Sequence, residues 1–171
     1  MPYLPRTFHK LCLFAFFVSA LLIGGNSFAV ENGQTFKEWV AECQTQPDTQ
    51  AQNCHIRQEV ESNRDAAARL TMMVIPSRRD KGFTAALVAP LGTALRPGLQ
   101  LQVDSLEPFK ATFEFCLPDG CIAYVDLKGE LLASLKKGKT LMVSTKAADG
   151  RQLDVPMSLA GFTAATGALV K

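Results

Sequence analysis

Short runs of apolar or alternating residues, separated by turn-forming residues, recur along most of the chain. In residues 54–60 the alternation places Ile56, Gln58 and Val60 on one face, as in a strand with one buried side. Such runs at short, regular spacing are typical of the antiparallel strands of a sandwich or barrel. The predicted strands are residues 54–60, 69–75, 83–89, 99–103, 111–116, 121–127, 140–145 and 151–155, with residues 36–41 as a strand or as a loop anchored by Trp39.

Two segments have helical spacing instead. In residues 130–137, leucines recur at three- and four-residue spacing and lysines occupy the last turn, which predicts a helix bounded by Gly129 and Gly138. The Ala-rich part of residues 158–169 predicts a short closing helix. The polar stretches 44–53 and 62–68 are predicted surface loops. Together these patterns predict an all-β fold with one or two short helices.

The first 29 residues have the layout of a secretory signal peptide. A basic start with Arg6 and Lys10 precedes an apolar run at 11–23, and small residues end it at Ser27 and Ala29. The run has thirteen residues, whereas a membrane-spanning helix needs about 20. We therefore expect cleavage near Ala29 and export of residues 30–171 as a single domain, to the periplasm, the outer surface or the medium.

Charge and composition narrow the function classes. Of 18 basic residues, two lie in the signal peptide, so the processed chain has 16 basic residues against 16 acidic ones. A chain near neutrality, without a basic stripe, does not suggest nucleic-acid binding. No later stretch is apolar enough to span a membrane. The expected protein is exported and soluble, with no transmembrane segment after processing.

Four cysteines remain after residues 1–29 are removed: Cys43, Cys54, Cys116 and Cys121. An even number in an exported chain indicates two disulfides, for which the sequence permits three pairings. Local geometry favours Cys43–Cys54, across the polar loop, and Cys116–Cys121, across a hairpin.

The hairpin prediction rests on turn chemistry. Pro118 suits the second position of the four-residue loop 117–120, and Gly120 suits a position with positive φ. Cys116 and Cys121 would then face each other directly at the strand ends, close enough for a disulfide.

The same cysteines fit two other kinds of site less well. A redox pair normally has C-x-x-C spacing at the start of a helix, whereas Cys116 and Cys121 are separated by four residues in strand-rich sequence. A four-cysteine zinc site usually has two closely spaced pairs, and Cys43 and Cys54 have ten residues between them. We expect structural disulfides, no metal and no cofactor.

Catalytic candidates are few. His55 is the single histidine left after processing, and a Ser-His-Asp set would have to use it, but an exposed histidine opposite the apolar face is the simpler interpretation. Glu114 alternates with phenylalanines and should face solvent from a strand whose other face is buried. The pattern of the basic cluster 78–81 predicts a solvated turn, with a binding role as the alternative. Trp39 is predicted to be a core anchor near the first disulfide. The sequence predicts no catalytic residues and no enzyme.

Five stretches, in order, resemble the invasion-associated locus B family of bacterial exported proteins. They are Trp39-x₃-Cys43, CHIRQ at 54–58, APLGTALRPG at 89–98, FCLPDGC at 115–121 and MSLAGFTAA at 157–165. The resemblance covers nearly the whole processed chain. It implies an immunoglobulin-like β-sandwich, a Gram-negative source and a periplasmic or outer-surface location, and it brings no catalytic residues.

Three functions follow as hypotheses. The first is a non-enzymatic envelope protein that binds another envelope or host-surface protein through faces and loops such as 44–53 and 78–83. The second is a small-ligand-binding protein with a pocket between its sheets. The third is a hydrolase that uses His55.

Overall fold

The computed structural model describes residues 30–62 and 65–170; the predicted signal peptide, residues 1–29, lies outside the described residues. The strands are β1 (Thr35–Phe36), β2 (Trp39–Thr45), β3 (Gln52–Ser62), β4 (Asp65–Pro76), β5 (Phe83–Ala89), β6 (Leu99–Val103), β7 (Phe109–Ala111), β8 (Phe113–Leu117), β9 (Gly120–Leu127), β10 (Thr140–Lys146) and β11 (Gln152–Ser158). The helices are α1 (Gly129–Lys137) and α2 (Phe162–Ala168). An antiparallel β-sandwich with two short helices confirms the predicted fold class.

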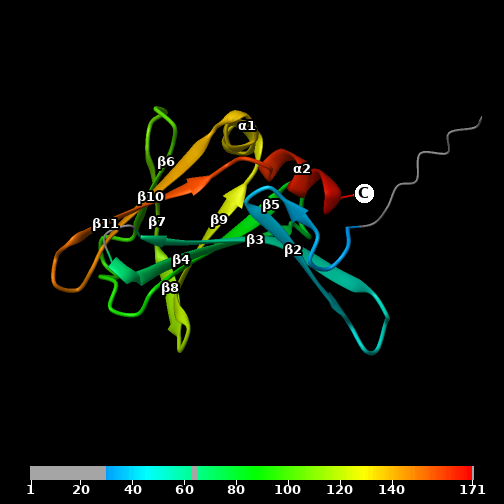
Figure 1. Ribbon diagram of the computed structural model, residues 1–171, viewed down its shortest axis with the longest axis horizontal. Helices are drawn as coiled ribbons and strands as arrows, with labels where there is room; N and C mark the ends of the chain where they lie inside the picture. Colours follow the sequence, from blue (N-terminus) through cyan, green and yellow to red (C-terminus); the bar gives the residue numbers. More distant parts are fainter. Residues whose placement is uncertain (1–29, 63–64, 171) are drawn as a thin grey trace, which may run out of the picture.

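The strands form two sheets (Figure 1). The larger has seven strands in the order β1-β2-β3-β4-β5-β9-β8, and the smaller has four in the order β11-β10-β6-β7. All the strand pairs in them are antiparallel. The chain moves from the smaller sheet to the larger one between β7 and β8, with a single residue, Thr112, between them.

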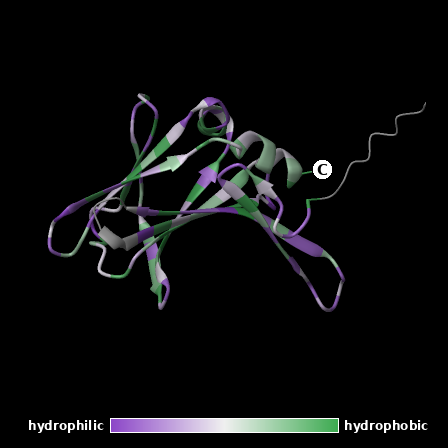
Figure 2. Ribbon diagram, viewed as in Figure 1, coloured by the Kyte–Doolittle hydropathy of each residue, from purple (hydrophilic) through white to green (hydrophobic). Residues whose placement is uncertain are grey.

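Alternating side chains from both sheets meet in the core. Along β6, β10 and β11 every second residue is buried, as a strand with one solvated face requires. Large side chains fill the space between the sheets; those less than 2 % exposed include Ile56, Leu70, Met72, Leu87, Leu101, Leu141 and Met157. The β2–β3 hairpin projects from this body and is hydrophilic towards its tip (Figures 1 and 2).

Trp39 and Gln58 join the sheets at one point. Trp39 is fully buried and donates a hydrogen bond from Nε1 to the Ser158 carbonyl, at 3.1 Å. Gln58, on the core face as its alternation predicts, donates from Nε2 to the same carbonyl at 2.9 Å. The Trp39 ring packs edge-to-face on Phe162, with centroids 5.2 Å apart. Trp39 is therefore a core anchor, but its aromatic partner lies on α2.

Three predictions about local structure need correction. Residues 65–68 belong to a strand and not to a loop, because β4 begins at Asp65, which pairs with Ser62; residues 63–64 lie outside the described residues. The predicted loop 44–53 is shorter, because β2 and β3 continue to Thr45 and Gln52. Residues 36–41 are divided between β1 and β2. In the first two cases pairing with a neighbouring strand extends regular structure into polar sequence, which weak local β-propensity does not reveal.

Candidate functional site: the outer face of the seven-stranded sheet

Both predicted disulfides are present. Cys43 pairs directly with Cys54 across β2 and β3, and Cys116 with Cys121 across β8 and β9. The Cys43 amide donates to Asn32 Oδ1 at 2.9 Å and so points away from β3. A pair without ladder hydrogen bonds brings its side chains closer together, which suits a disulfide.

The second hairpin is tighter than predicted. Leu117 pairs with Gly120, so its turn consists of Pro118 and Asp119. Gly120 has φ +147°, and a Cβ there would lie 2.4 Å from the carbonyl oxygen of Ala89 on β5. The glycine is therefore required by the turn and by its close contact with the neighbouring strand.

We expect the processed protein to have no reactive thiol in denaturant until it is reduced, and four afterwards. Replacing Cys43 and Cys54 by alanine should lower the free energy of unfolding by about 3 kcal/mol, and replacing Cys116 and Cys121 by about 2 kcal/mol, because the larger ring restrains more of the unfolded chain. Thiol titration and urea unfolding measure these effects. Four reactive thiols in the unreduced protein would contradict the disulfide assignment.

One half of the sheet's outer face is charged. Arg57 on β3 lies between two acids: its Nη1 is 3.7 Å from Glu42 Oε1, and its Nη2 contacts Glu59 Oε2. Arg69 on β4 is 2.9 Å from Glu59 Oε1 and bonds Glu61 at 2.9 Å. We call this set the charged half: Glu42, His55, Arg57, Glu59, Glu61 and Arg69. Its three carboxylates are paired with the two guanidinium groups, so its net charge is small and attracts a charged partner only weakly.

His55 belongs to the charged half. Its Nε2 lies 3.2 Å from Glu42 Oε2, and its side chain is 21 % exposed. The prediction of a simple exposed histidine is therefore wrong in part, because the ring is partly buried and paired. A Ser-His-Asp set would need a nucleophilic hydroxyl at this nitrogen, which here faces a carboxylate.

The other half of the same face is apolar. Cross-strand pairing places Met73 beside Ala86, Ala86 beside Tyr124, and Val88 beside Ile122. Phe115 on the edge strand β8 pairs with Ile122, and the centroids of the Phe115 and Tyr124 rings are 6.3 Å apart. The apolar half comprises Met73, Ala86, Val88, Phe115, Leu117, Ile122 and Tyr124. An antiparallel sheet with one face on the core normally has polar side chains on its other face, so this half is unusual.

A β-bulge decides where Phe115 points. The register shifts between Phe113 and Phe115, so Glu114 is an extra residue without a partner on β9. Phe113 pairs with the buried Ala123, whereas Phe115 pairs with Ile122 on the outer face and is 43 % exposed. Glu114 is exposed as predicted, but the prediction that both phenylalanines share one buried face is wrong, because an extra residue reverses the alternation.

The predicted basic turn is built around Ser77. Its hydroxyl accepts hydrogen bonds from the amides of Arg79 and Asp80, at 3.2 and 3.3 Å. Asp80 lies 3.8 Å from Lys128. Arg78 and Arg79 are exposed. The turn therefore presents guanidinium groups beside the apolar half of the sheet.

Two features are absent from the part of the chain that the structure describes. Within 30–62 and 65–170, no group of three or more His, Cys, Asp or Glu residues is placed to hold a metal ion. Over the same residues, no helix has the length and apolar character needed to cross a bilayer.

Comparison with known proteins places the chain in a family. Residues 39–170 match the family model described as invasion associated locus B protein. Invasion protein B homologues from two strains of Brucella abortus are 34 % identical to the chain over 148 residues, which span 86 % of the chain and 82 % of each relative. The crystal structure of invasion associated protein b from Bartonella henselae has the same fold, with a TM-score of 0.68 at 22 % identity, over 80 % of this chain and 93 % of that one. The chain belongs to the invasion associated locus B family.

Proposed function

We propose that the protein is an exported, non-enzymatic component of a Gram-negative cell envelope that binds another protein through the apolar half of its seven-stranded sheet. The observation that supports this proposal most directly is the exposure of Phe115, Leu117 and Tyr124, at 43 %, 51 % and 40 %, on one sheet face. Aromatic and aliphatic side chains gathered on an exposed face are enriched at protein interfaces. The relatives are named for invasion, which is compatible with a partner on a host cell.

Export is supported by sequence and chemistry together. Residues 1–29 have the layout of a signal peptide. The protein has two disulfides. Disulfides persist in oxidising compartments and are rare in the cytosol. We therefore propose that the folded domain is residues 30–171 and that it acts in the periplasm or at the outer surface.

The other two hypotheses have less support. Large buried side chains such as Trp39, Leu101 and Met157 occupy the space between the sheets where a ligand would have to lie. The pairing of His55 with Glu42 gives no support to a hydrolase.

A photo-crosslinking experiment tests the proposal. A benzophenone amino acid at Phe115 should give a discrete adduct in cells of the source bacterium or in contact with host cells. The same group at Leu106, which is 50 % exposed in the β6–β7 loop, should not. The partner so identified should bind the purified protein at least about tenfold more weakly when Tyr124 is replaced by alanine, because central aromatic residues dominate interface energies.

Two outcomes would contradict the proposal. Equal crosslinking from both positions would show that the apolar half is not a specific interface. An adduct of twice the chain mass, with dimers in sedimentation, would assign the face to self-association.

A further inference from the structure

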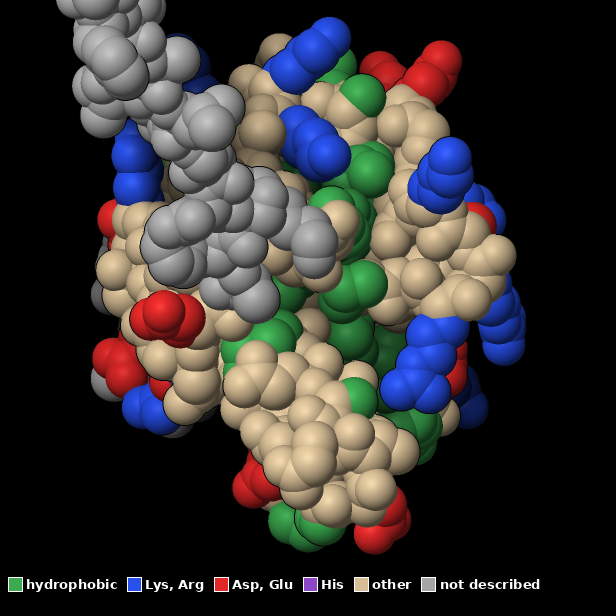
Figure 3. Space-filling view, turned by 90° about the vertical axis from the view of Figure 1, so that its right-hand side faces the viewer, with side chains coloured by type: hydrophobic (Ala, Val, Ile, Leu, Met, Phe, Trp, Pro, Cys, Tyr) green, Lys and Arg blue, Asp and Glu red, His purple; other side chains and the backbone are tan. Residues whose placement is uncertain are grey.

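A furrow with partly apolar walls runs between the end of α2 and the β4–β5 connection. It consists of two adjoining pockets of about 420 and 330 Å³, which share Pro76 and Ser77. Figure 3 shows apolar side chains in a strip down this side of the molecule, with Lys and Arg side chains along parts of its margin. The volume is in the range of small-ligand sites rather than of protein interfaces.

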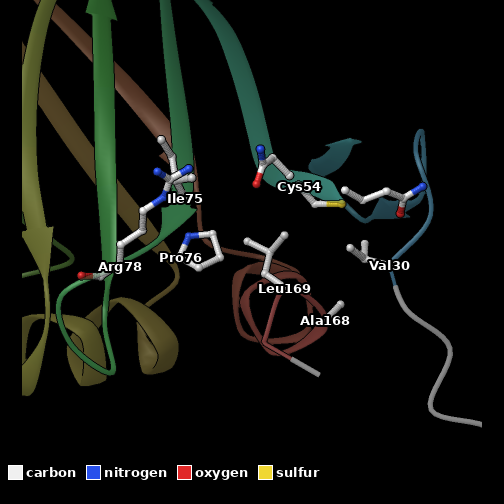
Figure 4. A pocket seen from close by; sticks show the side chains of 10 residues that line it. Val30, Cys54, Ile75, Pro76, Arg78, Ala168 and Leu169 are labelled. Carbon is white, nitrogen blue, oxygen red and sulfur yellow. The ribbon is translucent and has the colours of Figure 1, made fainter. Parts of the chain in front are cut away.

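The walls of the first pocket come from both ends of the described chain. Val30, Ile75, Pro76 and Leu169 provide apolar surface, and Figure 4 shows Leu169 at the end of α2 between Pro76 on one side and Val30 on the other. Ile75 is 44 % exposed. Gln52, Asn53 and Ser77 also line this pocket, so about half of its surface is apolar. Release of water from that half would favour a ligand with an apolar part.

The second pocket continues the apolar lining past Pro76. Phe83, Leu132 and Val170 line it, and Val170 is 62 % exposed. Lys136 Nζ lies 6.0 Å from the centroid of the Phe83 ring. This ammonium group therefore stands at the border between the apolar lining and solvent.

Three cationic side chains line the furrow. Arg78 lies in the first pocket, and Lys81 and Lys136 lie in the second. Among the described residues, none of the three has a carboxylate within 4 Å, whereas Asp80 in the second pocket already faces Lys128. Cations that lack an acidic partner beside an apolar cleft are complementary to a ligand with a hydrocarbon chain and an anionic head.

We propose that the furrow binds a single-chain anionic amphiphile, a fatty acid, with its alkyl chain along the two pockets and its carboxylate at the cations on their margins, Arg78 in the first pocket or Lys81 and Lys136 in the second. Each methylene group that leaves water contributes about fourfold in affinity, which favours a long alkyl chain over a short one. No residue of the apolar half lines either pocket, so the inference does not rest on the proposed partner.

The test uses the processed protein and a fluorescent fatty acid, cis-parinaric acid, displaced by dodecanoate. We expect saturable one-to-one binding. Dodecanoate should compete at least about tenfold better than dodecyltrimethylammonium, which has the same chain length and the opposite charge. Replacing both Arg78 and Lys136 by alanine should reduce this preference severalfold, and Leu169→Asp should weaken binding of either probe about tenfold or more.

Control variants separate the site from general surface effects. Lys110→Ala and Leu106→Ser change an exposed cation and an exposed leucine on or beside β7, and both should bind like the wild type. Circular dichroism and the unfolding midpoint establish whether Leu169→Asp folds. If it does not, the variant with alanine at both Arg78 and Lys136 tests the proposed site. Non-saturable binding, equal affinity for both head groups, or binding only to phosphatidylglycerol vesicles would overturn the proposal.

Discussion

Replacing Gly161 by alanine is expected to lower the free energy of unfolding by about 2–5 kcal/mol. Gly161 has φ +91° at the start of α2, where an alanine costs about 1–2 kcal/mol. Its Cβ would also lie 1.9 Å from the carbonyl oxygen of Phe36 and 2.7 Å from the carbonyl carbon. Backbone atoms cannot rotate away, so β1 or α2 must shift, which adds about 1–3 kcal/mol.

Gly150→Ala is the matched control for Gly161→Ala. Gly150 has φ +86° in the β10–β11 turn, with no atom within 4 Å of a built Cβ. Its replacement should cost about 1–2 kcal/mol, the conformational part alone. Urea unfolding followed by the fluorescence of Trp39, the one tryptophan of the chain, measures both variants. If both variants lost the same free energy of unfolding, the close contact between α2 and β1 would not be the reason that position 161 requires glycine.

Replacing Phe162 by alanine should cost about 3–5 kcal/mol, because the ring is fully buried and its removal leaves a cavity. The edge-to-face contact with Trp39 is lost as well, which by itself is worth about 0.5–1.5 kcal/mol. Since α2 packs on β1 and β2 at this end of the sandwich, the loss should loosen the attachment of the helix. Urea unfolding followed by circular dichroism is the appropriate measurement, because the variant alters the surroundings of Trp39.

Phe115→Ala is the matched comparison for Phe162→Ala, because it removes the same phenyl ring from the surface of the sheet. Because Phe115 is 43 % exposed, its truncation should cost less than about 1 kcal/mol. The same variant should lose binding to the proposed partner while it keeps its fold. A loss of stability equal to that of Phe162→Ala would mean that Phe115 is part of the core.

Local structure could be predicted to within a few residues. Strands β5 and β6 have the predicted bounds, and α1 begins one residue before the predicted helix. The cysteine pairs followed from the same reasoning, since a turn with Pro118 and Gly120 brings Cys116 opposite Cys121. These features depend on neighbours in the chain, and neighbours are what periodicity and turn chemistry describe.

The candidate binding face could not be predicted in the same way. The alternation of Phe113, Glu114 and Phe115 indicated one buried face, and a single bulged residue reversed it for Phe115. The pairing of His55 with Glu42 depends on the register of β2 against β3. Register is set by the hydrophobic pattern of both strands together with their turn, so one strand does not reveal it.

The sequence by itself indicated most of the strand and turn pattern, favoured the two local cysteine pairs, and predicted the family and export. The tertiary structure alone decided which residues from distant segments share a surface: Phe115 with Tyr124, Gly161 against Phe36, and Val30 with Leu169 in the furrow. The physical reason is that sequence pattern records which side of an element is apolar, whereas a surface is created when elements far apart in the chain pack together.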